Sequence, residues 1–225
     1  MLHAGSRLVR HPVSYRHGSH CRRLLGGDSR PPHSYHGPTG SMKALGKTMV
    51  EDGSRLEWQR PDIAVVLVHP QIPQNCGNIA RTCAASKVAL HLVGPMGFEL
   101  DDTKLKRAGL DYWDWVAVKV HENVDSFLEF FNTLDGEKRL FAYSKFGASH
   151  YAQEGLYLET SRNFLMFGAE TSGLPDNAHS AATDVVKIPM SNFDHVRSLN
   201  LATSVGIGLF ECIRQIDGAV LPEQE

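Results

Sequence analysis

One polar segment of the sequence, QIPQNCGNIAR, places a positive charge close to two side-chain amides. Its chemistry-bearing residues are Asn75, Asn78 and Arg81. A guanidinium is a planar, permanently charged donor that matches a phosphate or a carboxylate, and the amides add donors and acceptors. The segment therefore suits an anionic ligand, although a lone arginine more often caps a loop carbonyl at the surface.

A second segment, FGAETSGLP, combines two glycines with a carboxylate and two hydroxyls. Glycine lets the backbone approach a ligand closely, so this segment can offer main-chain N–H and C=O groups for recognition. Glu170 could hydrogen-bond a donor on such a ligand. The same residues also suit a plain turn that leads into a helix.

The third segment reads IPMSNFDHVRSLN and ends with Arg197, Ser198 and Asn200. We expect a polar loop that brings these side chains to the same sheet edge as the first two segments. Asp194 and His195 near Ser198 resemble parts of a hydrolase triad. That triad places its serine on a strand-to-helix elbow reading GxSxG, and the sequence has no such elbow.

Metal sites and the common nucleotide-binding loops have no signature in the sequence. Cysteines stand at positions 21, 76, 83 and 212 without a CxxC pair, so we expect reduced thiols and no metal. The GxG at Gly206-Ile207-Gly208 falls in a helical pattern and not after a strand, which excludes the dinucleotide fingerprint, and no P-loop is present. A nucleotide-like cofactor would have to be held by other loops.

The elements that must position these segments begin at Pro61, where short apolar runs alternate with helical stretches. The runs are continuously apolar, which is typical of a parallel sheet covered on both faces. We therefore predict an α/β fold with a mostly parallel sheet and helices on both faces. The predicted strands are 63–69, 89–93, 116–120, 140–143, 164–167 and 185–188, and the predicted helices are 78–87, 124–134, 175–181 and 199–216.

In the first segment, Pro70 and Pro73 are expected to prevent a helix until Asn78, which would cap the helix over 78–87. Arg81 then lies about 200° around the helix from Ile79 and points away from the buried side. This arrangement would place the guanidinium beside both asparagines at the mouth of the sheet, where ligands of open α/β sheets bind.

The last predicted helix is apolar around most of its circumference. Leu201, Val205, Leu209 and Ile213 follow one i, i+4 line, so the helix must be buried on most sides. Its two glycines are most easily explained where another backbone packs close. Pairing with a second copy and packing within the chain explain this pattern equally well.

Composition and charge bound the class of protein. The chain has 225 residues, 42% of them hydrophobic and 21% charged, and no apolar run reaches the roughly 18 residues that a membrane helix needs. Residues 1–60 carry ten Lys and Arg against four Asp and Glu, whereas the remaining body has a net charge of −8. An acidic body argues against broad charge-driven RNA binding, so an RNA would have to meet a local basic patch, the basic extension or a dimer groove.

The chain therefore divides into a basic extension at residues 1–60 and a folded domain at 61–225. Up to Met42 the extension is rich in Arg, Ser, His, Gly and Pro, which predicts disorder and fits an organellar transit peptide for a chloroplast or a mitochondrion. A solvated linker, or a true start at Met42 or Met49 with a cytoplasmic protein, remains an alternative.

Taken in order, the three segments resemble the SpoU branch of the SPOUT superfamily of RNA methyltransferases. NCGNIAR is similar to the first motif of that branch, FGAETSGLP to the second, and IPM followed by RSLN to the third. PMGF at 95–98 and RAGLDYW at 107–113 are similar to stretches of the small tRNA 2′-O-methyltransferases that act on the wobble cytidine or uridine. The resemblance covers about residues 62–216.

The resemblance implies a deep C-terminal trefoil knot, which the general rules of chain connection disfavour. It also implies S-adenosyl-L-methionine as cofactor, tRNA as partner, no metal and an obligate homodimer. The cofactor contacts carry over to Tyr143 (through its backbone), Gly168, Ile188 and Ser198. The functional polar positions carry over to Arg81, Asn75, Glu170, Ser198 and Asn200.

Arg81 matches an arginine that the family is thought to use for activating the ribose 2′-hydroxyl. A guanidinium with a pKa above about 12 is essentially never a free base, so we interpret Arg81 as holding the target phosphate and orienting the hydroxyl. Two departures bear on the choice of nucleotide: the SNFDHV loop is longer than in compact bacterial members, and Ala169 and Ser172 replace common residues. A catalytically silent RNA-binding or assembly factor and an rRNA methyltransferase are the competing interpretations.

Overall fold

The computed structural model describes residues 59–98, 115–192 and 195–218. Nearly all of the predicted extension, and the whole of the stretch at 107–113, lie outside these residues. Seven described strands form one sheet in the order β3-β2-β1-β6-β4-β7-β5, with every neighbouring pair parallel. They are β1 (Ile63–Val68), β2 (Ala89–Val93), β3 (Val118–His121), β4 (Lys138–Tyr143), β5 (Ser149–His150), β6 (Arg162–Phe167) and β7 (Asp184–Lys187).

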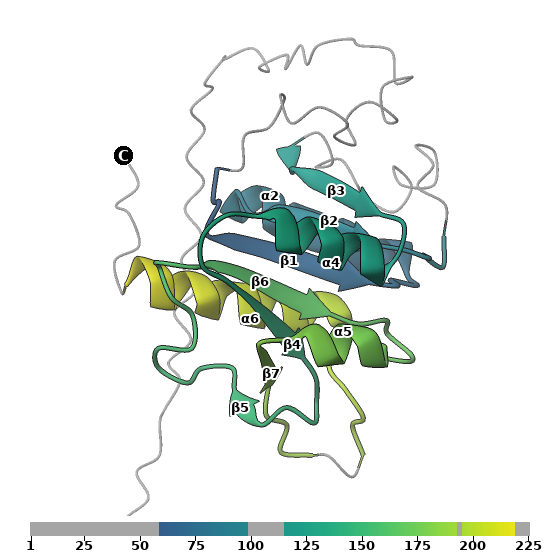
Figure 1. The fold of residues 1–225 in the computed structure, drawn as a ribbon. Coiled ribbons are helices and arrows are strands. Elements are labelled where there is room, and N and C mark those ends of the chain that lie inside the picture. The colour runs from purple at the N-terminus through teal and green to yellow at the C-terminus, as the bar shows by residue number, and fades with distance from the viewer. Residues whose placement is uncertain (1–58, 99–114, 193–194, 219–225) are drawn as a thin grey trace, which may run out of the picture. The chain divides into compact units, whose positions relative to one another are not determined.

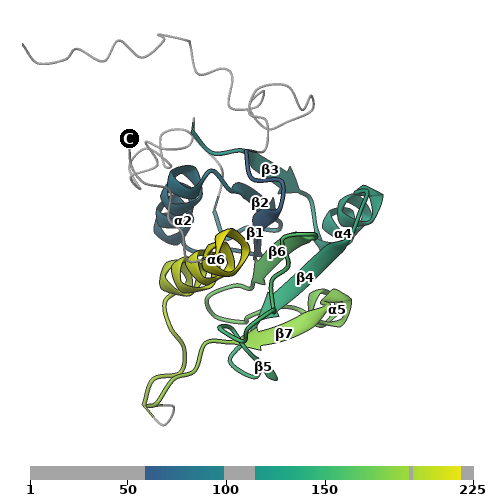
Figure 2. The same cartoon turned by 90° about the vertical axis from the view of Figure 1, so that its left-hand side faces the viewer.

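Helices cover both faces of this sheet, so the predicted α/β fold is confirmed (Figures 1 and 2). α2 (Pro73–Ser86) and α6 (Leu201–Asp217) lie on one face, and α4 (Val124–Thr133) and α5 (Asp176–Ala181) lie on the other. Strand β1 is buried along its whole length, and its alternate residues face the two core clusters in turn. A strand with two buried faces needs apolar residues at every position, which explains the run IAVVLV.

The strand boundaries differ from the prediction where polar residues pair within the sheet. β4 and β6 begin two residues before their apolar runs, because Lys138 and Arg139 pair with Arg162 and Asn163 at the start of the two strands. β5 has only two residues and no apolar run, so periodicity could not predict it.

The start of α2 corrects the prediction for the first segment. The helix begins at Pro73, with Ile72 as N-cap, and not at Asn78. Proline is well tolerated at the first helical position, because the N–H that it lacks would have no partner inside the helix. Asn75 and Asn78 therefore lie inside the helix, and Arg81 lies in its middle.

The order of the strands brings distant segments together. β6 lies between β1 and β4, although it follows both in sequence. The first and second polar segments therefore leave the carboxyl ends of neighbouring strands, and the third leaves the end of β7 at the same edge. After this third segment the chain returns as α6, which packs beside α2, β1 and β6. The knot itself stays a prediction.

The structure decides which of the two explanations of the apolar α6 pattern holds for Val205 and Leu209. Val205 and Leu209 are fully buried in the core cluster of the α2 face, so they pack within the chain. The side of α6 that faces away carries Gly206, Ile207 and Phe210, of which Phe210 is 55% exposed.

Neither a membrane-spanning helix nor a metal-binding cluster occurs in the described part of the chain. None of the described helices is long and apolar enough to cross a membrane. The same part of the chain contains no group of three or more His, Cys, Asp or Glu that could hold a metal ion.

Candidate active site

Glu170 is the centre of the hydrogen-bond network that joins the polar segments. Its carboxylate accepts from the backbone N–H of Gln71 at 2.9 Å, from that of Ile72 at 3.3 Å, and from Asn75 Nδ2 at 2.8 Å. These donors lie at the start of α2, whose first turn has no acidic residue of its own. Glu170 thus supplies from the second segment the negative charge that a helix N-terminus favours.

Asn75 extends the network to the third segment. Its side chain is 6% exposed, and its Oδ1 accepts from Asn200 Nδ2 at 3.0 Å. Asn200 is in turn the N-cap of α6, because its Oδ1 accepts from the N–H of Ala202 at 2.9 Å and of Thr203 at 3.3 Å. One chain of side-chain contacts therefore fixes the starts of both helices on the same face, as is usual for capping residues.

This network changes the expected role of Glu170. The sequence suggested a carboxylate that would bind a donor on a ligand, but its oxygens already accept three bonds from the first segment. Glu170, Asn75 and Asn200 are brought together as predicted, and their contacts position the loops. The backbone donors of Gln71 and Ile72 were missed, because main-chain groups have no signature in a sequence.

The second segment is a tightly closed loop. The N–H of Ala169 donates to the carbonyl of Gly173 at 3.1 Å, and the N–H of Gly173 donates to the carbonyl of Ala169 at 2.9 Å. A Cβ on Gly168 would lie 2.1 Å from the carbonyl carbon of Gly173, which is far inside contact distance. Gly168 is therefore required by the closure of the loop itself, in addition to any approach of a ligand.

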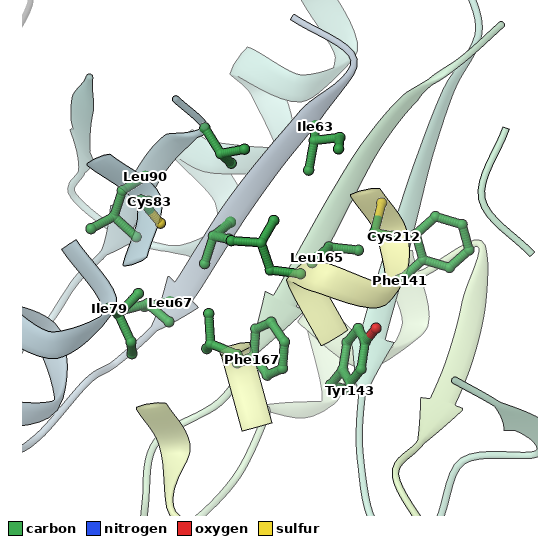
Figure 3. Packing of buried hydrophobic residues seen from close by; sticks show 14 of the residues in the cluster. Ile63, Leu67, Ile79, Cys83, Leu90, Phe141, Tyr143, Leu165, Phe167 and Cys212 are labelled. Carbon is green, nitrogen blue, oxygen red and sulfur yellow. The ribbon is translucent and has the colours of Figure 1, made fainter. Parts of the chain in front are cut away.

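Tyr143 ends β4 beneath α6, and its side chain points into the core. Its ring stacks on Phe167 with centroids 4.4 Å apart (Figure 3). Its hydroxyl is 2.5 Å from that of Tyr157. A Cβ on Gly208 would lie 2.6 Å from the Tyr143 hydroxyl, so the α6 glycine makes room for this ring and not for another backbone. Burial raises the pKa of Tyr143 well above its ordinary value, so the hydroxyl stays neutral. Any cofactor contact at this position must be made by the backbone.

Arg81 and Asn78 are both exposed on α2, as predicted, whereas Asn75 is turned inward to Glu170. Asn75 and Arg81 thus leave α2 on different sides. The two positions are six apart in sequence, which corresponds to about 9 Å along a helix axis. Arg81 is exposed on the outer side of α2.

Around the end of β7, Ile188 is partly buried against the same core cluster as Tyr143, and Arg197 and Ser198 are exposed. Residues 195–199 lead to Asn200, the N-cap of α6. The segment before α6 can be followed in Figure 2. The third segment thus offers an apolar side chain, a hydroxyl and a positive charge at the carboxyl edge of the sheet.

The described cysteines are inert. Cys76, Cys83 and Cys212 are free and buried. Burial, with the Glu170 carboxylate as a further cause, raises the pKa of Cys76 to about 12. A thiol of this kind holds its proton near neutral pH and is no nucleophile, so the chemistry of this edge belongs to its amide, hydroxyl, guanidinium and main-chain groups.

Comparisons with known proteins agree on one group. The model of the SpoU rRNA Methylase family matches residues 62–210. A protein of Synechocystis sp. named "Putative tRNA (cytidine(34)-2'-O)-methyltransferase" is 47% identical over 154 residues, which are 68% of this chain and 97% of the relative.

Solved structures show the same similarity. One structure, on the 2-OH methylation of C/U34 on tRNA, has 43% identity and a TM-score of 0.61, and the match covers 69% of this chain and 97% of that one. An AdoMet-bound rRNA methyltransferase from Sinorhizobium meliloti has 26% identity and a TM-score of 0.61, over 71% of this chain and 59% of that one.

Proposed function

The chain belongs to the SpoU methylase family, and from this premise we propose that it transfers a methyl group from S-adenosylmethionine to the ribose 2′-hydroxyl of cytidine or uridine 34 of tRNA. The observation that carries the proposal is the contact from Glu170 through Asn75 to Asn200. It joins three sequence-distant motifs at one edge of the sheet, in a chain whose relatives bear this activity in their names.

The groups at this edge fit S-adenosylmethionine. A nucleoside with an amino-acid tail needs an apolar contact, hydroxyl groups and main-chain donors and acceptors. Ile188, Ser198 and the backbones of Tyr143 and Gly168 are the groups that would hold it. When bound, this cofactor supplies a methyl group on a positively charged sulfur.

The chain's own contribution to the reaction is to position the RNA. Arg81 would hold a phosphate of the target nucleotide through its planar fork and so orient the ribose hydroxyl. Holding two reactants in line can supply up to roughly 7–11 kcal/mol of the barrier reduction, so little further catalysis is required.

The active unit would be a homodimer in which α6 faces a second copy. Gly206, Ile207 and Phe210 form a stripe on the side of α6 that faces away from the core, where Phe210 is exposed and a Cβ on Gly206 would meet nothing within 4 Å. Such a pairing would let one copy hold the cofactor while its partner contributes contacts to the RNA. Ile207→Glu with Phe210→Glu should give monomers by analytical ultracentrifugation, whereas the buried Val205 and Leu209 would unfold the chain if replaced in the same way.

The basic extension supports a proposal of organellar delivery. Residues 1–60 fused to a fluorescent protein should direct it to chloroplasts or mitochondria. Diffuse cytoplasmic fluorescence would instead support the alternative start at Met42 or Met49.

The decisive experiment is mass-spectrometric mapping of ribose methylation in organellar and cytosolic tRNA, with and without this protein. We expect loss of a 2′-O-methyl group at nucleotide 34. Loss of an rRNA methyl group would replace the tRNA by an rRNA substrate. RNA binding without any transfer by the purified protein would favour an assembly factor.

A further inference from the structure

A four-residue turn after β4 carries the most exposed large hydrophobic side chain of the described residues. Phe146 is 80% exposed. Single apolar residues on a surface are common, so exposure alone carries no argument. However, three hydrogen bonds of Ser144 hold the turn Ser144–Gly147 that presents the ring. This second observation points to a function.

Ser144 takes part in all three of the hydrogen bonds that hold the turn. Its N–H donates to the carbonyl of Val186 in β7 at 2.8 Å, its carbonyl accepts from the N–H of Gly147 at 3.0 Å, and its Oγ accepts from the N–H of Phe146 at 3.3 Å. The backbone N–H groups of Phe146 and Gly147 are thus both bonded to Ser144, which holds the backbone of the phenylalanine in a defined direction.

Gly147 presses the turn against the end of β7. A Cβ there would lie 2.5 Å from the carbonyl carbon of Val186 and 2.7 Å from the nitrogen of Lys187, both main-chain atoms that cannot move aside. The turn therefore sits on the strand that leads into the third polar segment. Because β4 lies between β6 and β7 and all strands are parallel, Phe146 leaves the sheet at the same edge as the second and third segments.

Positive charge accompanies the ring. Lys145 Nζ lies 4.9 Å from the centroid of the Phe146 ring, which is a cation–π contact, and Lys187 ends the strand beneath the turn. The four residues of the turn include no acidic side chain. An exposed aromatic face next to an ammonium matches an unpaired nucleobase and its phosphate.

We infer that the Phe146 ring is a platform on which an unpaired base of the RNA substrate stacks, with Lys145 contacting a neighbouring phosphate. The inference rests on the proposed function only in taking RNA as the substrate. Phe146 acts as a binding and positioning residue, since stacking of a loop base would hold the neighbouring ribose in place for the reaction. Stacking tolerates any base, so Phe146 would contribute affinity more than base selectivity.

The test compares the full-length protein with Phe146→Ala, Phe146→Tyr and Trp115→Ala. Trp115 is the matched control, because it is 73% exposed but precedes β3 and thus lies at the opposite edge of the sheet. The probe is a fluorescein-labelled anticodon stem-loop RNA whose Kd is measured by anisotropy. S-adenosylmethionine affinity by calorimetry, oligomeric state and thermal unfolding are measured on the same samples.

Phe146→Ala should raise the Kd for RNA about 5- to 150-fold, the equivalent of about 1–3 kcal/mol per stacked base. Phe146→Tyr should restore binding and Trp115→Ala should leave it unchanged. Lys145→Gln should reduce the slope of log Kd against log salt by about one. The affinity for S-adenosylmethionine and the oligomeric state should be the same in all variants as in the wild type.

Three results would overturn the inference: an unchanged RNA Kd in Phe146→Ala, a parallel loss of cofactor affinity, or dissociation of the dimer. The last two would place the ring in the cofactor pocket or between subunits. If the wild type binds RNA through Phe146 but methylates no 2′-hydroxyl, the stacking inference stands and the proposed function fails. If the wild type methylates tRNA and Phe146→Ala binds like it, only the stacking inference fails.

Discussion

The two faces of the sheet are held together in different ways. On the α4 face, His91 and His121 stack with ring centroids 5.2 Å apart and pack against the edges of Phe127. On the α2 face, the side-chain bond from Asn75 to Glu170 spans 95 residues of sequence, and that from Asn200 to Asn75 spans 125. The first face has an apolar core to which these rings are packed, whereas on the second face polar contacts between remote segments are added to the apolar core and place the motifs.

We therefore expect changes on the two faces to affect different properties, namely the stability of the fold and the positioning of the motifs. A change on the α4 face should act on unfolding and leave the motifs in place. A change in the polar network should act on methyl transfer by more than its cost in stability. The following substitutions and conditions test that separation, beginning with the largest effect.

Arg81→Ala should abolish methyl transfer, with a loss of at least about 100-fold, since misplacement of a reacting group by about 1 Å can have that effect. Cofactor affinity by calorimetry should stay close to that of the wild type, because Arg81 is assigned to the RNA. Arg81→Lys should fail as well, as a point charge does not reproduce a planar fork. Near-full activity of Arg81→Lys would reduce the role of Arg81 to charge neutralisation.

Glu170→Ala should lower the free energy of unfolding by about 1–3 kcal/mol, because it leaves the buried amide of Asn75 and the donors at the start of α2 without their acceptor. Methyl transfer should fall further than this cost explains. Urea unfolding and single-turnover assays on one preparation would separate the two effects. The matched control is Glu159→Ala, an exposed carboxylate in the segment before β6, which should change neither.

Gly208→Ala and Gly206→Ala form a matched pair on one helix. Gly208→Ala should lower the free energy of unfolding by about 1–3 kcal/mol, because the new methyl group overlaps the Tyr143 ring, whose hydroxyl is hydrogen-bonded to that of Tyr157. Gly206→Ala meets open space and should gain up to about 1 kcal/mol of helix stability. If Gly206→Ala also shifts the monomer–dimer equilibrium, the stripe of α6 around it contacts the second copy.

Acidification should weaken the α4 face first. Burial, with the charge of Lys119 as a further cause, lowers the pKa of His121 to about 4, and burial also lowers that of His91. Each histidine binds its proton more readily in the unfolded chain, so stability is full above about pH 6.5 and falls as the pH drops toward 4. Thermal unfolding from pH 7.5 to 4.5 measures the slope, which His121→Gln should flatten.

Sequence patterns predicted the alternation of strands and helices and the gathering of three motifs at one edge, because buried parallel strands are continuously apolar and their carboxyl ends share an edge. They failed at Pro73, where proline was taken to exclude a helix that it in fact begins. They also left open whether Val205 and Leu209 face a partner or the core, since apolarity reports burial without saying against what. The bonds of Glu170 to Gln71 and Ile72 could not be predicted, because they depend on β6 lying next to β1.

The insertion of β6 between β1 and β4 has a consequence for folding during synthesis. Ile63 of β1 pairs with Asn163 of β6. One edge of the apolar strand β1 therefore stays unpaired until about a hundred further residues have left the ribosome. Contacts of such sequence separation slow folding, and an unpaired apolar edge invites association with other chains. The motif loops become neighbours only after that strand is inserted. Active-site assembly should therefore be among the last events of folding, and chaperone dependence should appear in nascent chains that end before residue 162.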